Sequence, residues 1–207
     1  GGALGVGDAV RWGLLGLAVA LAVRGAVRPR ALAAVACAAA VGSLAASAWA
    51  PDVATRPALW VLDVGQGDAL LLRIPGEGAI LVDGGGTPYG DFDVGAEIVV
   101  PALRALGARR LRAVVATHAD ADHAECLQAV VRTLPVGTLA HGHPAPDRPV
   151  WTRLAELARA EGVPTLALRR GMRIALGDAT LHVLHPTARP TGDANADSVV
   201  LRVDWRG

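Results

Sequence analysis

The chain has 207 residues, of which 52% are hydrophobic, and its formal net charge at pH 7 is +1. This length allows one domain with a full core and a smaller appendage. The near-neutral charge excludes a broadly basic surface that would hold nucleic acid by charge alone. Cys37 lies in an apolar run and Cys126 on a predicted helix, and we do not expect them to pair. The chain starts at Gly1 without Met and stops at Gly207 after a strand-like run, so we expect a piece of a longer protein.

The first fifty residues are the most apolar part of the chain. Two uncharged apolar runs, 12–23 and 31–50, are separated by a short segment that contains three arginines. The second run is about as long as a membrane-spanning helix requires. We therefore predict α-helical membrane segments in residues 1–50, with the arginine-containing loop in the cytoplasm and the following domain outside. A signal peptide that ends at Ala48-Trp49-Ala50 would export the same domain, and a pair of buried Ala-rich helices in a soluble protein is a third alternative.

A polar linker with two prolines, residues 51–57, precedes a predicted domain at 58–207. In this domain, apolar runs bounded by turn residues predict short strands, and apolar residues three to four positions apart predict helices. The predicted strands are 58–64, 69–74, 79–82, 111–116, 136–140, 165–168, 173–176, 180–184 and 198–205. The predicted helices are 94–106, with a kink at Pro101, 124–133 and 151–161.

Four side chains that can bind metal ions follow the predicted strand 111–116: His118, Asp120, Asp122 and His123. Imidazole nitrogen suits zinc or manganese, and carboxylate oxygen suits harder ions. A turn at the strand end can direct His118 and Asp120 to one ion, and Asp122 and His123 to a second. We therefore predict a two-metal hydrolytic site with Mn²⁺ or Zn²⁺, in which His118 and Asp122 are catalytic and Asp122 orients the attacking water and takes its proton. A solvated loop and a purely structural metal site are the alternatives.

Two other turns place acids beside glycines. Asp63 and Asp68 flank Gly65-Gln66-Gly67, and Asp83 precedes three consecutive glycines. Glycine permits tight turns and lets backbone approach a ligand closely. We expect Asp63, Asp68 and Asp83 to lie near the site and to support its metal ligands rather than to bind the ions themselves. Two tight hairpin turns are the simpler interpretation of the same residues.

Four segments resemble the metallo-β-lactamase-fold domain of ComEC-type DNA-uptake channel proteins. They are LDVGQGDA at 62–69, LVDGG at 81–85, THADADH at 117–123 and NADSVVL at 195–201. The resemblance implies an α+β fold, an αββα sandwich whose site lies at the edge of two facing sheets. In this chain the sandwich would be C-terminally incomplete and preceded by the end of a transmembrane competence domain.

The resemblance also implies a function and a location. It indicates part of a DNA-uptake channel for natural transformation, a multi-pass protein in the plasma membrane of a bacterium, with the metal-dependent domain on the extracytoplasmic side. That domain would be a nuclease that degrades the DNA strand that is not imported. Its partners would be DNA, the membrane and other components of the DNA-uptake machinery. Arg109, Arg110 and Arg112 could contact the DNA backbone, although a solvated arginine face is the simpler explanation.

Two departures from the family pattern affect the predicted site. Asp120 stands where the family motif has a second histidine, which makes the first site harder and favours manganese relative to zinc. The family's later Gly-Asp motif and terminal histidine motif do not occur in this sequence, so we expect the chain by itself to be inactive or nearly so. His185 occupies a position in chain order at which the fold often supplies another ligand. His141 and His143 are weaker candidates, and we expect His182 to be structural.

Two other functions are consistent with these residues. The domain could be catalytically silent and could guide DNA or support the channel structurally, but such a role would not need the ligand cluster. A metallo-hydrolase of a small ester or amide would use the same cluster, and substrate profiling would be needed to distinguish it from a nuclease.

Overall fold

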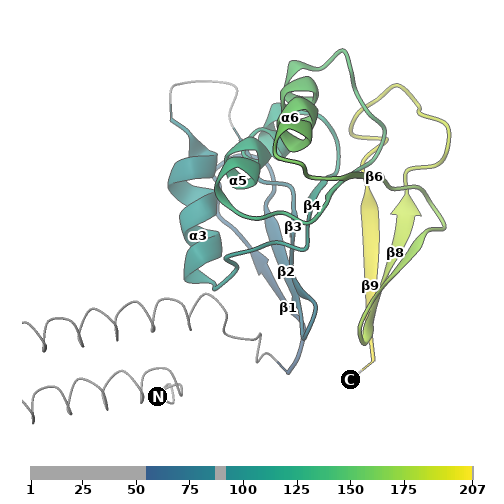
Figure 1. Cartoon of the computed structure of the whole chain (residues 1–207). Coiled ribbons are helices and arrows are strands. Elements are labelled where there is room, and N and C mark those ends of the chain that lie inside the picture. The colour runs from purple at the N-terminus through teal and green to yellow at the C-terminus, as the bar shows by residue number, and fades with distance from the viewer. Residues whose placement is uncertain (1–54, 87–91, 207) are drawn as a thin grey trace, which may run out of the picture. The chain divides into compact units, whose positions relative to one another are not determined.

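The computed structural model describes residues 55–86 and 92–206, which are coloured in Figure 1. The predicted membrane segments, the alternative signal peptide and the first part of the linker lie outside the described residues. Within these two ranges, no helix is both long enough and apolar enough to span a bilayer.

Six strands form the larger sheet in the order β1-β2-β3-β4-β5-β6. The first three pair antiparallel, and β3, β4, β5 and β6 pair parallel. Parallel strands bring their carboxyl ends to one edge of a sheet, so the residues that follow β3 and β4 meet there. The strands are β1 Ala58–Val61, β2 Leu70–Ile74, β3 Gly78–Val82, β4 Ala113–Ala116, β5 Leu139–His141 and β6 Thr165–Ala167.

The smaller sheet contains β7 Arg173–Leu176, β8 Ala179–His185 and β9 Val200–Trp205 in antiparallel order. The pairing of β8 with β9 shifts between Val183 and His185. This irregularity occurs at the end of β8, just before the long loop that leads to β9.

The predicted helices differ from the observed ones mainly at their boundaries. The predicted helix 94–106 consists of a π-helical segment, Gly95–Val99 (η1), followed by α3, Val100–Ala105. Pro101 lies in the first turn of α3, directly after the π-helical segment, and it has no N–H to donate to a carbonyl of that segment. The predicted helix 124–133 is divided into α4, Ala121–Ala124, and α5, Leu127–Thr133. The last helix, α6, is Pro149–Ala160.

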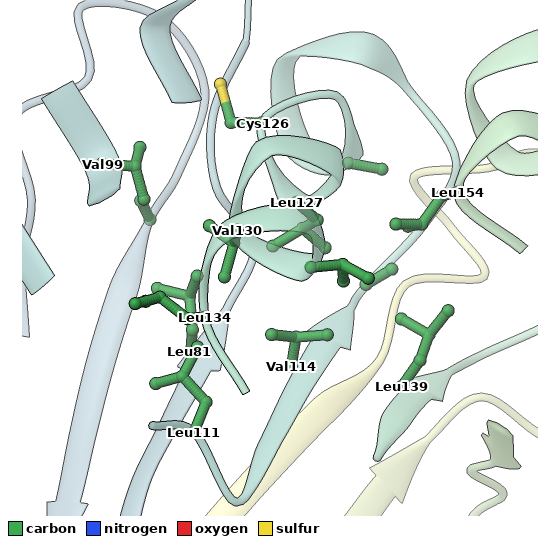
Figure 2. Close-up of a cluster of buried hydrophobic side chains, with 14 of the residues drawn as sticks. Leu81, Val99, Leu111, Val114, Cys126, Leu127, Val130, Leu134, Leu139 and Leu154 are labelled. Atoms are coloured by element: carbon green, nitrogen blue, oxygen red, sulfur yellow. The ribbon is translucent and has the colours of Figure 1, made fainter. Parts of the chain in front are cut away.

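Two hydrophobic cores hold the layers together. The larger core lies between the helices and one face of the six-stranded sheet, where Leu81, Val114 and Leu139 pack beneath Leu127 and Val130 of α5 (Figure 2). The smaller core joins the opposite face of that sheet to β7, β8 and β9. The described residues therefore form three layers, helix on sheet on sheet. The fourth, helical layer of the expected αββα sandwich is not formed by residues 55–86 and 92–206.

Shortening a side chain of the larger core should destabilise the domain. Leu127 is fully buried, and Leu127→Ala removes apolar contacts and leaves a cavity. We expect a loss of about 2–5 kcal/mol in the free energy of unfolding, measured by urea denaturation. Val61→Ala is the control, because Val61 is 74% exposed and should change stability by less than about 0.5 kcal/mol. Equal effects of the two substitutions would contradict this core.

Candidate metal centre

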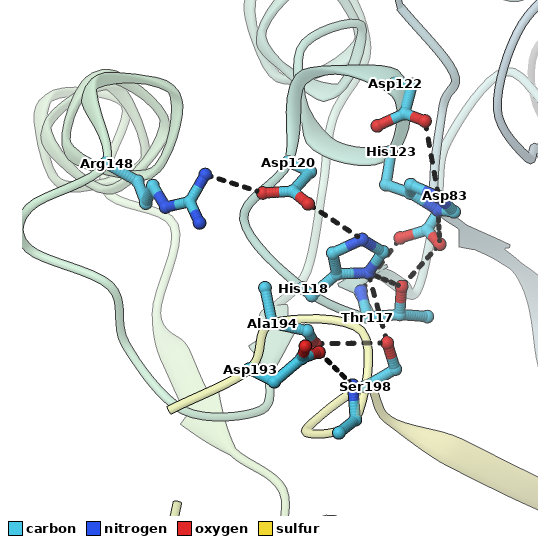
Figure 3. A network of polar contacts seen from close by, with 11 residues as sticks. Asp83, Thr117, His118, Asp120, Asp122, His123, Arg148, Asp193, Ala194 and Ser198 are labelled. Carbon is cyan, nitrogen blue, oxygen red and sulfur yellow. Dashed lines mark hydrogen bonds and ion pairs between the residues drawn. The ribbon is translucent and has the colours of Figure 1, made fainter. Parts of the chain in front are cut away.

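The predicted ligands lie at the carboxyl edge of the six-stranded sheet (Figure 3). His118 follows β4, Asp120 is the N-cap of α4, and Asp122 and His123 lie within that short helix. Asp83 follows the neighbouring parallel strand, β3. The parallel pairing of β3 with β4 therefore brings Asp83 beside the cluster, although the two segments are far apart in the sequence.

Asp83 is 2% exposed, and its carboxylate accepts hydrogen bonds from two neighbouring residues. Its Oδ1 accepts the backbone N–H of Thr117 at 2.8 Å, and its Oδ2 accepts the Thr117 hydroxyl at 2.6 Å. The same Oδ2 lies 2.8 Å from Nδ1 of His123. Asp83 has a φ of 55°, in the left-handed region that aspartate tolerates better than most residues. Its partners hold the carboxylate in this conformation.

The contact with Asp83 determines the tautomer of His123. An ionised carboxylate can only accept hydrogen bonds, so Nδ1 of His123 must carry the hydrogen. When the ring is neutral, Nε2 therefore keeps a lone pair, and this atom lies 3.9 Å from Oδ2 of Asp122. Metal-binding histidines commonly donate one ring N–H to a carboxylate and bind the ion with the other nitrogen. His123 has this arrangement, with Nε2 as the nitrogen that could bind an ion.

The same carboxylate acts on His118 through Thr117. The Thr117 hydroxyl gives its one hydrogen to Asp83, so at 3.0 Å from Nδ1 of His118 it can only accept a hydrogen bond. Nδ1 of His118 therefore carries the hydrogen, and Nε2 presents its lone pair 3.7 Å from Oδ2 of Asp120. The Ser198 hydroxyl lies 3.2 Å from the same Nδ1. In its neutral form, each imidazole thus turns Nε2, the nitrogen without a hydrogen, toward a carboxylate.

The two imidazole rings also influence each other. Their centroids are 4.1 Å apart, with an angle of 48° between the ring planes. Burial lowers the pKa of His118, and the nearby charge of His123 lowers it further. The hydrogen bond to Asp83 raises the pKa of His123. His118 is therefore the ring that is more readily neutral, the form that binds a metal ion.

Glycines allow three backbone segments to pack tightly around the cluster. A Cβ built on Gly67 would lie 1.5 Å from the backbone oxygen of Asp122, and one on Gly86 would lie 2.2 Å from that of Ala121. The N–H of Gly85 donates to the carbonyl oxygen of Asp68 at 2.8 Å. The glycine-containing turns after β1 and β3 are thus in direct contact with α4, because no side chain separates the backbones.

Asp120 is held from two sides. Its Oδ2 faces His118, and its Oδ1 lies 3.0 Å from Nη1 of Arg148, the N-cap residue of α6. Oδ1 is buried and makes no hydrogen bond, so the ion pair with Arg148 is the contact that compensates it. No motif in the sequence indicates Arg148, because it lies in a proline-containing loop.

The three acids that we predicted to support the ligands differ in how they contact the cluster. Asp83 contacts the cluster directly. Asp68 is exposed, and its charge is near enough to contribute to the raised pKa of His123. Asp63 is also exposed, and its Oδ1 accepts the N–H of Gly65 at 3.2 Å, within its own turn. Of the three predicted supporting residues, Asp83 is therefore the one with a direct hydrogen bond to a candidate ligand.

His185 is linked to the cluster through Ser198. Its Nδ1 lies 3.0 Å from the backbone oxygen of Ser198, whose hydroxyl contacts His118. A carbonyl oxygen only accepts, so Nδ1 of His185 carries the hydrogen, and Nε2 is the nitrogen with a lone pair when the ring is neutral. His185 thus has the same tautomer as the two clustered histidines.

The other candidate residues are engaged elsewhere. His141 is buried against Trp151, with ring centroids 4.6 Å apart, and its Nδ1 bonds to the oxygen of Gly142. The remaining pairs are His143 with the oxygen of Thr187, His182 with Asp204, and Arg112 with Glu77. Burial raises the pKa of the Cys126 thiol to about 12, so this thiol stays protonated at neutral pH.

The donors fit a divalent cation as pairs. Two ligands of one ion lie about 3 to 4 Å apart when each bond is about 2.1 Å long. The Nε2–Oδ2 separations of His118 from Asp120 and of His123 from Asp122, 3.7 and 3.9 Å, fall in this range. In the described part of the chain, no three His, Cys, Asp or Glu side chains form a group that could hold an ion. Each pair therefore offers two candidate ligands.

Comparisons with known proteins indicate the family and the fold of the chain. Residues 62–193 match the family model described as the metallo-beta-lactamase superfamily. The chain is 29% identical over 168 residues to ComE operon protein 3 of Bacillus subtilis (strain 168), a match that covers 76% of this chain and 22% of that protein. It is also similar to the crystal structure of MEM-A1, a subclass B3 metallo-beta-lactamase from a soil metagenome library. That match has a TM-score of 0.51 and 19% identity, and it covers 72% of this chain and 55% of the other.

The close approach of the turn after β1 to α4 predicts a specific effect of Gly67→Ala. The added Cβ would collide with the backbone of Asp122, so the turn or α4 must move. Gly65→Ala is the matched control, because Gly65 also has a positive φ but no atom lies within 4 Å of its Cβ position. We expect Gly65→Ala to cost about 1–2 kcal/mol of stability, from the backbone alone. Gly67→Ala should cost clearly more stability than Gly65→Ala, measured by urea denaturation. Equal losses of stability would contradict the close approach.

The two histidines should titrate in a defined order in the metal-free protein. His123 has the raised pKa and His118 the lowered one, so His123 should stay protonated to the higher pH in an NMR titration of the ring resonances. His123 then adds stability below its unfolded pKa of 6.5, and this contribution disappears as the pH rises through its folded pKa. His118 has the opposite effect, because it costs stability as the pH falls below 6.5. The reverse order of titration would contradict the contact of His123 with Asp83.

Proposed function

Because the chain belongs to the metallo-beta-lactamase superfamily, we propose that its described domain is a metal-dependent phosphodiesterase that cleaves DNA. The match to ComE operon protein 3 confirms the resemblance to ComEC-type proteins that the motifs indicated. The chain spans 22% of the length of that relative, so the function of the whole protein is part of the proposal.

One observation carries the hydrolase part of the proposal. Asp83, directly and through Thr117, holds two imidazoles so that each Nε2 lone pair faces a carboxylate. A loop with only a structural role has no need of two such rings. This arrangement therefore favours a catalytic domain over a silent, DNA-guiding one.

We assign the residues as follows. His118 with Asp120 and His123 with Asp122 would each hold one of two divalent ions, Mn²⁺ or Zn²⁺, and the second carboxylate favours Mn²⁺. The ions would supply a water of lowered pKa and positive charge beside the phosphate oxygens. Asp122 is 36% exposed, so one of its carboxylate oxygens can orient the attacking water and accept its proton. His185, with its free Nε2, is the proposed further ligand.

The DNA substrate and the cellular role follow from the ComEC-type resemblance. The protein would form part of a DNA-uptake channel in a bacterial plasma membrane and degrade the strand that is not imported. Residues 1–50 would anchor this domain on the extracytoplasmic side, where it would meet DNA and the rest of the uptake machinery. The likeness to a metallo-beta-lactamase structure indicates the fold alone, so it does not favour a small amide or ester substrate.

The proposal is tested by metal-dependent cleavage of labelled linear DNA. The whole gene product that contains this chain is assayed with Mn²⁺ and with Zn²⁺, and we expect His118→Ala and Asp122→Ala to reduce cleavage by more than about 100-fold. His182→Ala is the matched control, because His182 pairs with Asp204 outside the cluster. Absence of cleavage from a folded, metal-loaded protein would exclude the nuclease.

A further inference from the structure

We propose that Arg148 binds a phosphate of the nucleic-acid strand adjacent to the phosphodiester that is cleaved. The site is a pocket between the candidate metal centre and the start of α6. This inference rests on the proposed function and adds to it a residue that holds the substrate strand.

The pocket has a volume of about 330 Å³ and lies directly beside the candidate ligands. Asp120 and Asp122 line one wall, Gln66 contributes from the turn after β1, and Arg148 and Pro149 line the side that belongs to α6. A substrate phosphate at the metal centre would therefore lie at the mouth of this pocket, and the next phosphate of a strand could enter it.

Arg148 has donors that its present contact does not use. Its side chain is 51% exposed, and Nη1 contacts Oδ1 of Asp120 at 3.0 Å. A guanidinium carries five N–H donors in a planar fork, so one edge can face Asp120 while others face the pocket. That fork matches the oxygens of a phosphate. Arg148 is the one basic residue among those that line the pocket.

The backbone holds Arg148 in place. Its N–H donates to the oxygen of Ala145 at 2.9 Å, and its oxygen accepts the N–H of Thr152 at 3.1 Å. Pro149 follows and restricts the backbone of Arg148. No side chain caps α6 at this end, so the N–H groups of its first turn add partial positive charge at the same wall.

Charge explains why a strand, and not a compact substrate, would use this site. Asp120 and Asp122 make the wall of the pocket repel an anion, and Arg148 compensates one of these charges. A polynucleotide carries a phosphate on every nucleotide, so it can fill both the metal centre and the pocket. A substrate with a single phosphate has no group to place beside Arg148.

The test is equilibrium binding of a short, fluorescein-labelled single strand with hydrolysis-resistant phosphorothioate linkages to the Mn²⁺-loaded protein. Fluorescence anisotropy over a series of salt concentrations compares the wild type with Arg148→Ala and Arg159→Ala. We expect Arg148→Ala to weaken binding by about 10-fold and to reduce the slope of log K against log salt by about 0.7. Arg159 is exposed in the last turn of the same helix, so Arg159→Ala should change neither value.

Calorimetry with Mn²⁺ distinguishes a contact with DNA from an effect on Asp120. We expect Arg148→Ala to bind Mn²⁺ at least as well as the wild type, because the substitution removes a cation from beside a candidate ligand. An unchanged salt slope, or a loss of Mn²⁺ affinity that accounts for the weaker DNA binding, would overturn the proposal. If the wild type binds the strand through Arg148 but cleaves no DNA, the nuclease fails, and only the contact of Arg148 with a strand phosphate stands. If the wild type cleaves DNA while Arg148→Ala keeps the wild-type salt slope, the nuclease stands and the phosphate contact of Arg148 fails.

Discussion

The candidate site depends on one buried carboxylate, that of Asp83. A carboxylate removed from water is costly unless hydrogen bonds compensate it, and here Thr117 and His123 supply them. The same bonds orient both imidazoles, because a carboxylate accepts only and a hydroxyl has one hydrogen to give. The hydrogen bonds that compensate the buried charge of Asp83 are therefore the same ones that orient the Nε2 atoms of His118 and His123. Any change that moves Asp83 must also change the tautomer or orientation of His118 and His123.

The sheet and the glycines bring the parts of the site together. Parallel pairing of β3 with β4 places Asp83 beside the start of the ligand motif, and the glycines after β1 and β3 let backbone lie against α4. The segments that resemble ComEC-type proteins are thus adjacent in space. Gly67 leaves room for the backbone of Asp122. The motif at residues 62–69 therefore belongs to the site, although its two acids, Asp63 and Asp68, are exposed.

Asp120 lies between the candidate metal centre and the pocket in which the proposed substrate strand would bind. In place of a neutral histidine, the chain has a carboxylate, which adds negative charge beside Asp122. Arg148 lies against the outer oxygen of Asp120 and compensates that charge. Asp120, which stands where the family motif has a histidine, and Arg148, from a distant loop, therefore form one ion pair. It leaves a cation at the rim of an otherwise acidic site, where a polyanion would approach.

The sequence by itself determined the cluster at residues 118–123, the strands of both sheets to within a few residues and the family, because ligands in one turn and apolar periodicity are local patterns. It did not show that helix 94–106 changes type near Pro101. Only the tertiary structure decided which groups orient the ligands. Asp83 lies 34 residues from Thr117 and 40 from His123, and Ser198 lies 80 from His118. The glycines beside Asp83 indicated a place near the site, but its pairing with Thr117 and His123 depends on strand order and register, which local sequence patterns do not show.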